Sequence, residues 1–257
     1  MWVVGTEVLE ALAQRRHFGA ADALVGRLRV WLPGLPPPAF AMKVVETDAY
    51  WANWIDGTHA DGITLKVNTH ERIEYEQRSA RGLAAHEIAG HAAHVAGMRQ
   101  AVRDGRLDAC ALNLTVHSCE AFHMEGLAQV ALYALSRPGE LDEGDELRLR
   151  HRMHSGAVLN QAQIRMEHGM TLEEAAAWAH ARCPLLNPKN VHASLRDRAR
   201  SALYRGYMHV YAPSLAFFLA VRSMSRAGRT AFLREAWTSV STPSQLGGAL
   251  EAAGAAG

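Results

Sequence analysis

Residues 84–94 of the 257-residue chain read Ala-Ala-His-Glu-Ile-Ala-Gly-His-Ala-Ala-His. His86 and His91 are five residues apart, one more than in the common HExxH pair. On a straight α-helix, four residues leave two side chains about 40° apart, and five leave them roughly 140° apart. A π-bulge absorbs one residue and restores a shared face, and Gly90 makes such a distortion easier. The HExxxH stretch therefore predicts its own deformed helix.

The residue types in this stretch are those of a metal site. Neutral imidazoles of His86 and His91 can bind a zinc ion, and the carboxylate of Glu87 can take a proton from metal-bound water. The chain has 14 histidines, so a His pair at this spacing can also arise by coincidence. The decision depends on a third ligand elsewhere in the chain.

The candidate third ligand is Glu125. It lies in the segment Phe122-His123-Met124-Glu125-Gly126-Leu127-Ala128-Gln129, which begins an apolar helical pattern. Glu125 follows His91 by 34 residues, which leaves room for a loop and a returning helix. A catalytic zinc site takes three protein ligands and keeps its fourth position open.

With these two motifs, residues 62–135 resemble the tyrosine-carboxypeptidase family of HExxxH metallopeptidases and its bacterial relatives. A looser likeness is to putative bacterial peptidases with HE-x-x-P-G-H-H and E-G-W-A segments, whose His pair is one residue further apart and whose Pro is missing here. The resemblance implies a gluzincin-like metallopeptidase with zinc ligands His86, His91 and Glu125 and with Glu87 as the base. It also implies carboxypeptidase-like action on a peptide or small amide substrate.

Composition limits the partners and the compartment. Hydrophobic residues make up 49% of the chain and the formal net charge is +1, so we expect a globular protein that binds neither nucleic acid nor membrane. The three cysteines contain no CxxC pair, which favours a reducing compartment. With no secretory signal and no apolar run of about 18 residues, we expect a cytoplasmic protein.

Apolar periodicity predicts a mainly α protein: one helical domain over 1–257 with a small N-terminal β element. Helix is expected over 6–32, with a possible break near Gly19, and almost throughout from residue 74, and two strands at 41–46 and 62–68. The Ala/Gly-rich tail from about residue 247 is expected to fray. The expected helices after residue 74 span 79–97, 114–135, 145–167, 172–182, 191–211, 214–226 and 230–240.

The aromatic stretch Tyr50-Trp51-Ala52-Asn53-Trp54 has two interpretations. Its rings can cap the small sheet, or they can line a substrate cleft.

A second polar cluster surrounds the start of the Glu125 helix. Glu120 and His123 form a Glu-x-x-His unit of the di-iron type, but no second unit is present. We therefore expect Glu120 or His123 to orient a ligand imidazole. His94, three residues past His91, is expected to lie on the surface or to orient a ligand, and the alternative is that His94 rather than His91 reaches the ion.

A tyrosine stripe provides candidates for substrate contacts. Tyr204, Tyr207 and Tyr211 share one helical face, with Arg205 and His209 beside it. Such a stripe is often simply core. If it is functional, Tyr207 stabilises the oxyanion, Arg205 anchors a substrate carboxylate, and the other three contact substrate.

Three hypotheses follow. The first is a zinc hydrolase that cleaves a peptide or related amide. The second is a non-haem iron oxygenase with the same His/His/Glu set. The third is a helical binding module whose metal is structural or lost. The role of Glu87 as a base favours the first.

Overall fold

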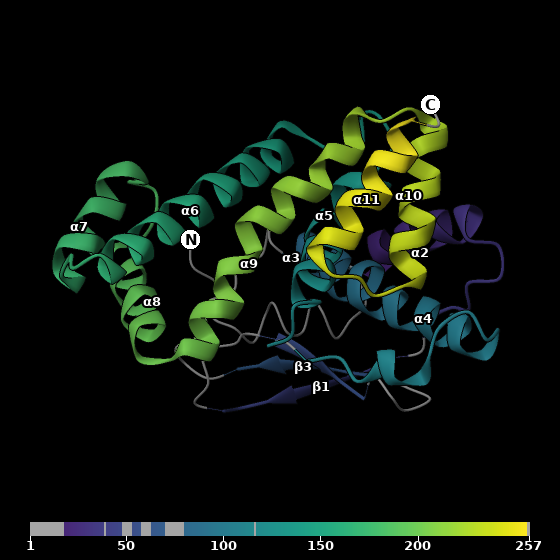
Figure 1. Ribbon diagram of the computed structural model, residues 1–257, viewed down its shortest axis with the longest axis horizontal. Helices are drawn as coiled ribbons and strands as arrows, with labels where there is room; N and C mark the ends of the chain where they lie inside the picture. Colours follow the sequence, from purple (N-terminus) through teal and green to yellow (C-terminus); the bar gives the residue numbers. More distant parts are fainter. Residues whose placement is uncertain are drawn as a thin grey trace.

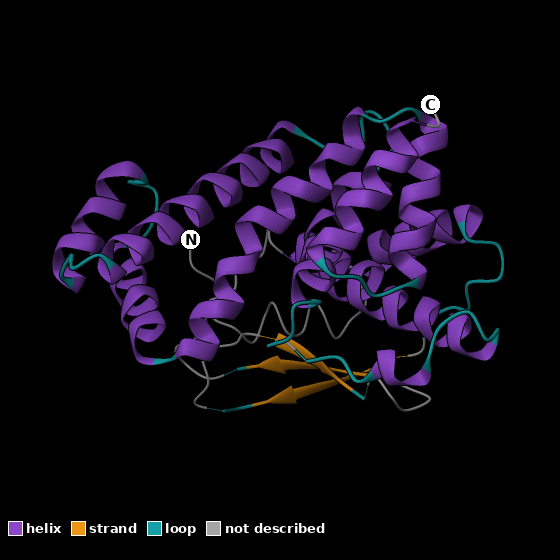
Figure 2. Ribbon diagram, in the orientation of Figure 1, coloured by secondary structure: helices purple, strands orange, loops and turns teal. Residues whose placement is uncertain are grey.

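The computed structural model describes residues 18–38, 40–47, 53–57, 63–69, 80–115 and 117–255. These residues form a mainly helical body with a small three-stranded sheet near the N-terminus, as Figures 1 and 2 show. The predicted fold class is confirmed. The expected helix before residue 18 and the ring pair Tyr50 and Trp51 lie outside the described residues.

The HExxxH stretch lies on one continuous helical rod with a deformed middle. The rod begins as α3 (Ala80–Ala84), continues as the π-helix η2 (Ala85–Ala92) and ends as α4 (Ala93–Arg103). The backbone N–H of Ala93 reaches the carbonyl oxygen of Ile88, five residues back, which is the π pattern. The predicted distortion is confirmed, although the rod ends at Arg103 rather than at the expected Gly97.

Helix α5 (Ala121–Leu135) forms the centre of the hydrophobic core. Nearly all of its side chains are buried, and it packs on η2 on one side and on α9 (Ala202–Leu219) on the other. The helix begins at Ala121, seven residues after the expected start, and residues 114, 115 and 117–120 lie in loop and turn. The core also takes side chains from α2 (Phe18–Trp31), α10 (Arg226–Thr238) and α11 (Pro243–Ala255).

The small sheet has the order β1-β3-β2, with β1 (Phe40–Val45) parallel and β2 (Asn53–Asp56) antiparallel to β3 (Ile63–Asn68). Alternate residues of β3 are buried, as a strand with one covered face requires. β1 and β3 confirm the two expected strands. β2 was not expected, because four residues are too short to show a period of two.

The chain returns through α6 (Glu143–Glu167), α7 (Leu172–Arg182) and α8 (Pro188–Arg200) before α9. Thr171 caps α7 with Glu174 in the predicted capping box. The single helix expected over 191–211 is wrong: it divides at Ser201, whose side chain accepts the N–H of Tyr204 and starts α9.

Pro213 does not end α9, contrary to the expected division between residues 211 and 214. A proline inside a helix leaves the carbonyl four residues earlier without its donor. That carbonyl belongs to His209, and the side-chain amide of Asn160 from α6 donates to it at 2.9 Å. The helix therefore continues because a neighbouring helix supplies the missing hydrogen bond.

The expected fraying of the tail is also wrong, because α11 extends from Pro243 to Ala255. Thr242 and Gln245 bond each other's backbone N–H groups at its start, and Pro243 occupies the first helical position. Leu246 and Ala253 are buried against the core. Burial of one helical face offsets the flexibility of the glycines.

A second, smaller hydrophobic cluster lies where α6, α7 and α8 meet. The long helices α6 and α9 join this end to the main body in Figure 1. The one-domain organisation remains a prediction.

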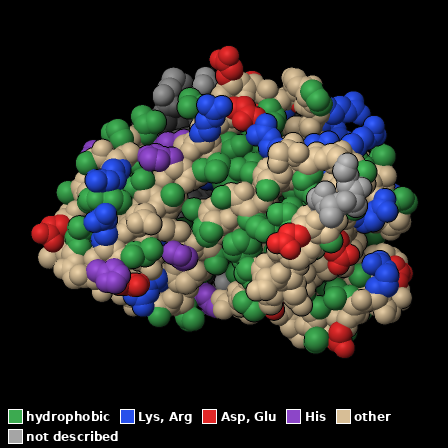
Figure 3. All heavy atoms as spheres, turned by 45° about the horizontal axis from the view of Figure 1, so that its top comes forward, with side chains coloured by type: hydrophobic (Ala, Val, Ile, Leu, Met, Phe, Trp, Pro, Cys, Tyr) green, Lys and Arg blue, Asp and Glu red, His purple; other side chains and the backbone are tan. Residues whose placement is uncertain are grey.

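On the face shown in Figure 3, hydrophobic side chains gather in the middle, with charged side chains of both signs toward the margins. No described helix is long and apolar enough to span a membrane.

Candidate metal centre

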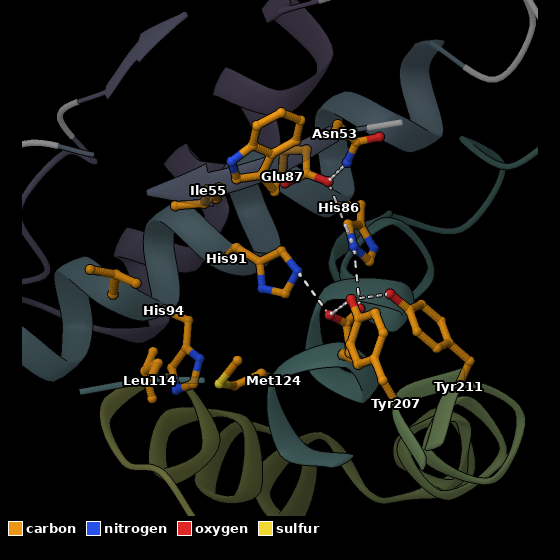
Figure 4. A pocket seen from close by; sticks show the side chains of 13 residues that line it. Asn53, Ile55, His86, Glu87, His91, His94, Leu114, Met124, Tyr207 and Tyr211 are labelled. Carbon is orange, nitrogen blue, oxygen red and sulfur yellow. Dashed lines mark hydrogen bonds and ion pairs between the residues drawn. The ribbon is translucent and has the colours of Figure 1, made fainter. Parts of the chain in front are cut away.

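The π-helix brings His86 and His91 to one side of the rod. Their imidazole rings lie perpendicular, with centroids 4.7 Å apart. Each side chain is about one-sixth exposed, at 16% and 17%. Both rings therefore face a cavity next to the rod instead of pointing to opposite sides of it, as Figure 4 shows.

Glu125 reaches the same point from α5. Its Oε2 lies 3.6 Å from Nε2 of His86, and its Oε1 lies 3.8 Å from Nε2 of His91. One donor atom from each of the three residues lies within 4.8 Å of the others. The three residues expected to be ligands are thus brought together by two different elements.

The close approach of η2 and α5 depends on Gly90. A Cβ atom placed on Gly90 would lie 2.5 Å from Cα of Ala128. Gly90 has no positive φ, so its role is to permit close packing of the helices. Easing of the π distortion, the role expected for Gly90, is therefore not its only role: the close packing of η2 on α5 also requires a glycine here.

The donor set fits a divalent cation. Tetrahedral ligands about 2.0–2.2 Å from a zinc ion lie roughly 3.3–3.6 Å from one another. The two His–Glu125 distances, 3.6 and 3.8 Å, are close to this range, and the set with one donor from each residue extends to within 4.8 Å. Within the described part of the chain, the buried Oε2 of Glu125 accepts no hydrogen bond. A buried carboxylate oxygen without a partner is uncommon unless a cation or water serves it.

Burial keeps the two imidazoles in the neutral state that metal binding requires, but it acts against ionisation of Glu125. It lowers the pKa of His91 to about 4 and that of His86 well below its ordinary value, with the neighbouring His91 adding to the second shift. Both imidazoles are therefore neutral near pH 7 and can offer lone pairs. Burial raises the pKa of Glu125 to about 7, although Tyr207 acts in the opposite direction.

Glu87 faces the cavity beside these three residues. Its Oε1 lies 3.7 Å from Nε2 of His86 and accepts a hydrogen bond from the side-chain amide of Asn53. Burial, followed by repulsion from Glu125, raises the pKa of Glu87 to about 8. A carboxyl group held in this way is suited to accepting and returning a proton near neutral pH.

Two members of the tyrosine stripe line the same cavity, which has a volume of about 140 Å³. The hydroxyl of Tyr207 donates to Oε1 of Glu125 at 2.8 Å, and the hydroxyls of Tyr207 and Tyr211 are 2.5 Å apart. Burial, with the charge of Glu125, raises the pKa of both phenols, so both remain protonated donors.

The other three residues of the stripe do not line this cavity. Arg205 pairs with Glu167 at 3.5 Å, and Tyr204 is buried in α9. His209 is exposed, and its backbone carbonyl receives Asn160. The structure therefore places the expected carboxylate anchor and two of the expected substrate contacts away from the metal centre.

His94 and His123 are buried, and neither is bonded to a ligand imidazole. Nε2 of His94 lies 2.6 Å from the carbonyl oxygen of Ser239, and Nε2 of His123 lies 2.9 Å from that of Ala236. The backbone N–H of Ser241 donates to Nδ1 of His123. Both rings fasten the α10–α11 connection to the rod and α5, and the surface position considered for His94 is wrong.

Glu120 lies at the start of α5 and is not among the residues that line the cavity. Among the described residues, His86, His91 and Glu125 form the one group with three donors close enough to share an ion.

Sequence reasoning missed Asn53 as a functional residue. It stands on β2 beside Trp54 and Ile55, and all three line the cavity. The cleft interpretation of the aromatic stretch therefore applies to Trp54, which lies in the sheet itself. Leu114, Met124 and Val95 complete an apolar part of the wall, and no sequence signal marks them.

Comparisons of the chain with protein-family models, with curated proteins and with solved structures find no match in any of the three. The function is therefore argued from the residues around the cavity.

Proposed function

We propose that the protein is a mononuclear zinc-dependent hydrolase that cleaves a peptide or a related amide bond. One observation carries the proposal: the donors of His86, His91 and Glu125 lie within 4.8 Å of one another, and the buried carboxyl group of Glu87 faces the same cavity. This is the residue set that the HExxxH peptidase resemblance implies, and carboxypeptidase-like action belongs to the proposal.

The proposed chemistry divides between the ion and the protein. A zinc ion held by three protein ligands lowers the pKa of a bound water and polarises a carbonyl group. Glu87 accepts the proton of the attacking water and later transfers it to the leaving nitrogen. Asn53 holds one oxygen of Glu87, so the other is free to face the water.

Tyr207 is the proposed donor for the negative charge that develops on the carbonyl oxygen. Its hydroxyl donates to Oε1 of Glu125 at 2.8 Å, so the proposal requires this hydroxyl to turn from Glu125 to the carbonyl oxygen when substrate binds. Tyr211 contacts the same hydroxyl and can hold it in place as the charge develops.

The test compares the metal content and peptidase activity of the purified protein with those of Glu87→Gln and Glu125→Ala. We expect about one zinc per chain in the wild type and in Glu87→Gln, and loss of zinc in Glu125→Ala. A library of short peptides should be cleaved by the wild type, and Glu87→Gln should lower kcat by about 10²–10⁴-fold.

The other outcomes separate the alternatives. Iron in place of zinc would favour the oxygenase that uses the same His/His/Glu set. No metal in any variant would leave the binding module. The hydrolase is preferred because Glu87 is buried in the cavity, where an oxygenase has no evident use for a base.

The proposed location is the cytoplasm. Its support is that Cys110, Cys119 and Cys183 are all free thiols, as a reducing compartment allows.

A further inference from the structure

A second cavity shares Tyr207 with the cavity of the candidate metal centre. Its volume is about 270 Å³, and Tyr207 lines both cavities. The Tyr207 ring lies near the imidazole of His117, with centroids 6.4 Å apart. Tyr207 therefore lies at the border of both cavities.

The second cavity lies between two segments that adjoin residues of the candidate metal centre. One is the turn that leads into α5, where Ser118 donates to the carbonyl of Thr115 at 2.9 Å. The other is the first half of α9, which carries Tyr207. Because α5 and α9 pack against each other along their lengths, the cavity is held in a fixed position relative to Glu125.

The cavity is lined by Ala121, Ala202 and Tyr207 and by six further residues. None of these described residues is Asp, Glu, Lys or Arg, and the one imidazole is that of His117. An aliphatic group would bury apolar surface there favourably, whereas a charged group would find no Asp, Glu, Lys or Arg to offset the hydration that it loses. The six residues are His117, Ser118, Cys119, Leu203, Gly206 and Val210.

The size of the cavity suits one side chain. Drug-sized ligands occupy sites of roughly 300–1,000 Å³, so 270 Å³ is too small for a whole peptide. Gly206 lines the cavity, and a Cβ placed there would meet no heavy atom within 4 Å, so a larger side chain at this position has room to occupy the space.

We propose that the second cavity is a specificity pocket, which takes an uncharged aliphatic side chain of the substrate next to the bond cleaved at the metal centre. This inference rests on the proposed hydrolase function, because it assigns the cavity to the same substrate. The occupant has the size of Leu or Met, and acidic or basic side chains are bound less well.

The first test fills the pocket. Peptides with each residue type at the two positions flanking the cleaved bond are compared in the wild type, Gly206→Ala and Gly206→Leu. At one position the wild type should prefer Leu or Met to Asp or Lys by at least about tenfold in kcat/KM. Gly206→Leu should remove this preference and favour Gly or Ala there, with Gly206→Ala between the two.

Matched variants control for folding. Gly26 is also a glycine inside a helix with open surroundings, so Gly26→Leu makes the same change far from the pocket and should keep the wild-type preference. Leu203 is 63% exposed, so Leu203→Asp should fold even if Gly206→Leu does not. Leu203→Asp should shift the preference toward Lys and Arg.

The second test does not need turnover. Cys119 lines the pocket and Cys110 does not, and both thiols are exposed. A neighbouring carboxylate, Glu120 or Asp108, raises the pKa of each, so they form a matched pair for alkylation by iodoacetamide. In Glu87→Gln, N-acetyl-Ala-Leu-Ala should slow alkylation of Cys119 several-fold and leave that of Cys110 unchanged, and N-acetyl-Ala-Asp-Ala should protect neither.

The two tests distinguish the failure of each proposal. Protection of Cys119 by the Leu peptide, without cleavage of any peptide, would overturn the hydrolase and retain the pocket. Suppose instead that peptides are cleaved and that neither Gly206→Leu nor Leu203→Asp changes the residue preference. This result would overturn the pocket and retain the hydrolase.

Discussion

At the scale of single residues, Glu87 has its closest polar partner on a different element. Glu87 is on η2, and Asn53, which donates to its Oε1, is on β2. Residues that orient a catalytic group can change its rate without touching the substrate. The sheet therefore contributes to the site through one amide.

Replacing Asn53 with Ala should lower kcat by about 10–100-fold, because Glu87 loses the contact that fixes its orientation. Zinc content should stay near that of the wild type, because Asn53 touches none of the three ligands. The measurement is kcat on a cleaved peptide beside elemental analysis. An equal loss of zinc and activity would show instead that Asn53 supports the metal site as a whole.

Residue types and spacing predicted only part of the site. The ligand set and Glu87 are marked in the sequence by a motif, and the structure brings them together. Asn53 is separated from Glu87 by 34 positions and has no motif of its own, so only the pairing of β2 with β3 reveals it. Arg205 pairs with Glu167 and does not line the cavity, which was not predictable because helical spacing alone does not say which face of the helix meets the cavity.

At the scale of elements, the metal centre depends on the distance between η2 and α5. Gly90 on η2 contacts Ala128, and Gly126 on α5 leaves no room for a Cβ atom against Phe218 and Ser214. α5 is therefore in close contact with a helix on each side.

Gly90→Ala should destabilise the fold and weaken zinc binding at least about tenfold, because the new methyl group meets the backbone of Ala128 and moves η2 away from Glu125. Gly82→Ala is the control on the same rod, since its Cβ would meet nothing within 4 Å. It should stabilise the helix by up to about 1 kcal/mol. Thermal unfolding and zinc titration measure both variants, and equal behaviour of the two would contradict this explanation.

Local patterns predicted some elements better than others. The five-residue His spacing predicted the π distortion because the geometry of an α-helix allows no other shared face. The continuation of α9 through Pro213 was not predictable locally, because it depends on Asn160 from α6. The start of α11 was marked by Thr242 and Gln245, but the low helix propensity of its glycines concealed the signal.

At the scale of the whole molecule, Asp145 ties the start of α6 to the start of the rod that carries His86 and His91. Its carboxylate accepts from Arg148 at 2.7 Å and from Arg81 of α3 at 3.2 Å. Burial acts to raise the pKa of Asp145, but these cations and the backbone N–H of Asp142 outweigh it, so the pKa lies below its ordinary value of 3.8.

The sign of the pH dependence follows from this shift. The ionised Asp145 stabilises the fold fully above pH 3.8, and its contribution is lost as the pH falls through the lower pKa of the folded state. The thermal midpoint of Asp145→Asn should therefore be lower than that of the wild type at pH 7, and the difference should narrow below about pH 4. Glu251→Gln, on an exposed part of α11, is the control. A difference that is constant from pH 7 to 3 would contradict the prediction.

The mainly helical class was predictable because the 3.6-residue period recurs along most of the chain. The arrangement of the helices was not, since it depends on contacts between distant positions. Trp237 shows this: it is fully buried, and its indole N–H donates to the carbonyl of Ala89 in the π-helix, 148 positions away.

The glycine contacts also define a search pattern for other chains. Two of the three candidate ligands, His91 and Glu125, are next in sequence to a glycine that has no room for a side chain. Gly90 precedes His91, and Gly126 follows Glu125. The arrangement therefore reads as His-Glu-x-x-Gly-His, followed after some tens of residues by Glu-Gly-x-Ala, where the last residue is the small side chain of Ala128. A chain that matches the ligands but has bulky residues at either glycine position would have to separate its helices, and it should be excluded from such a search.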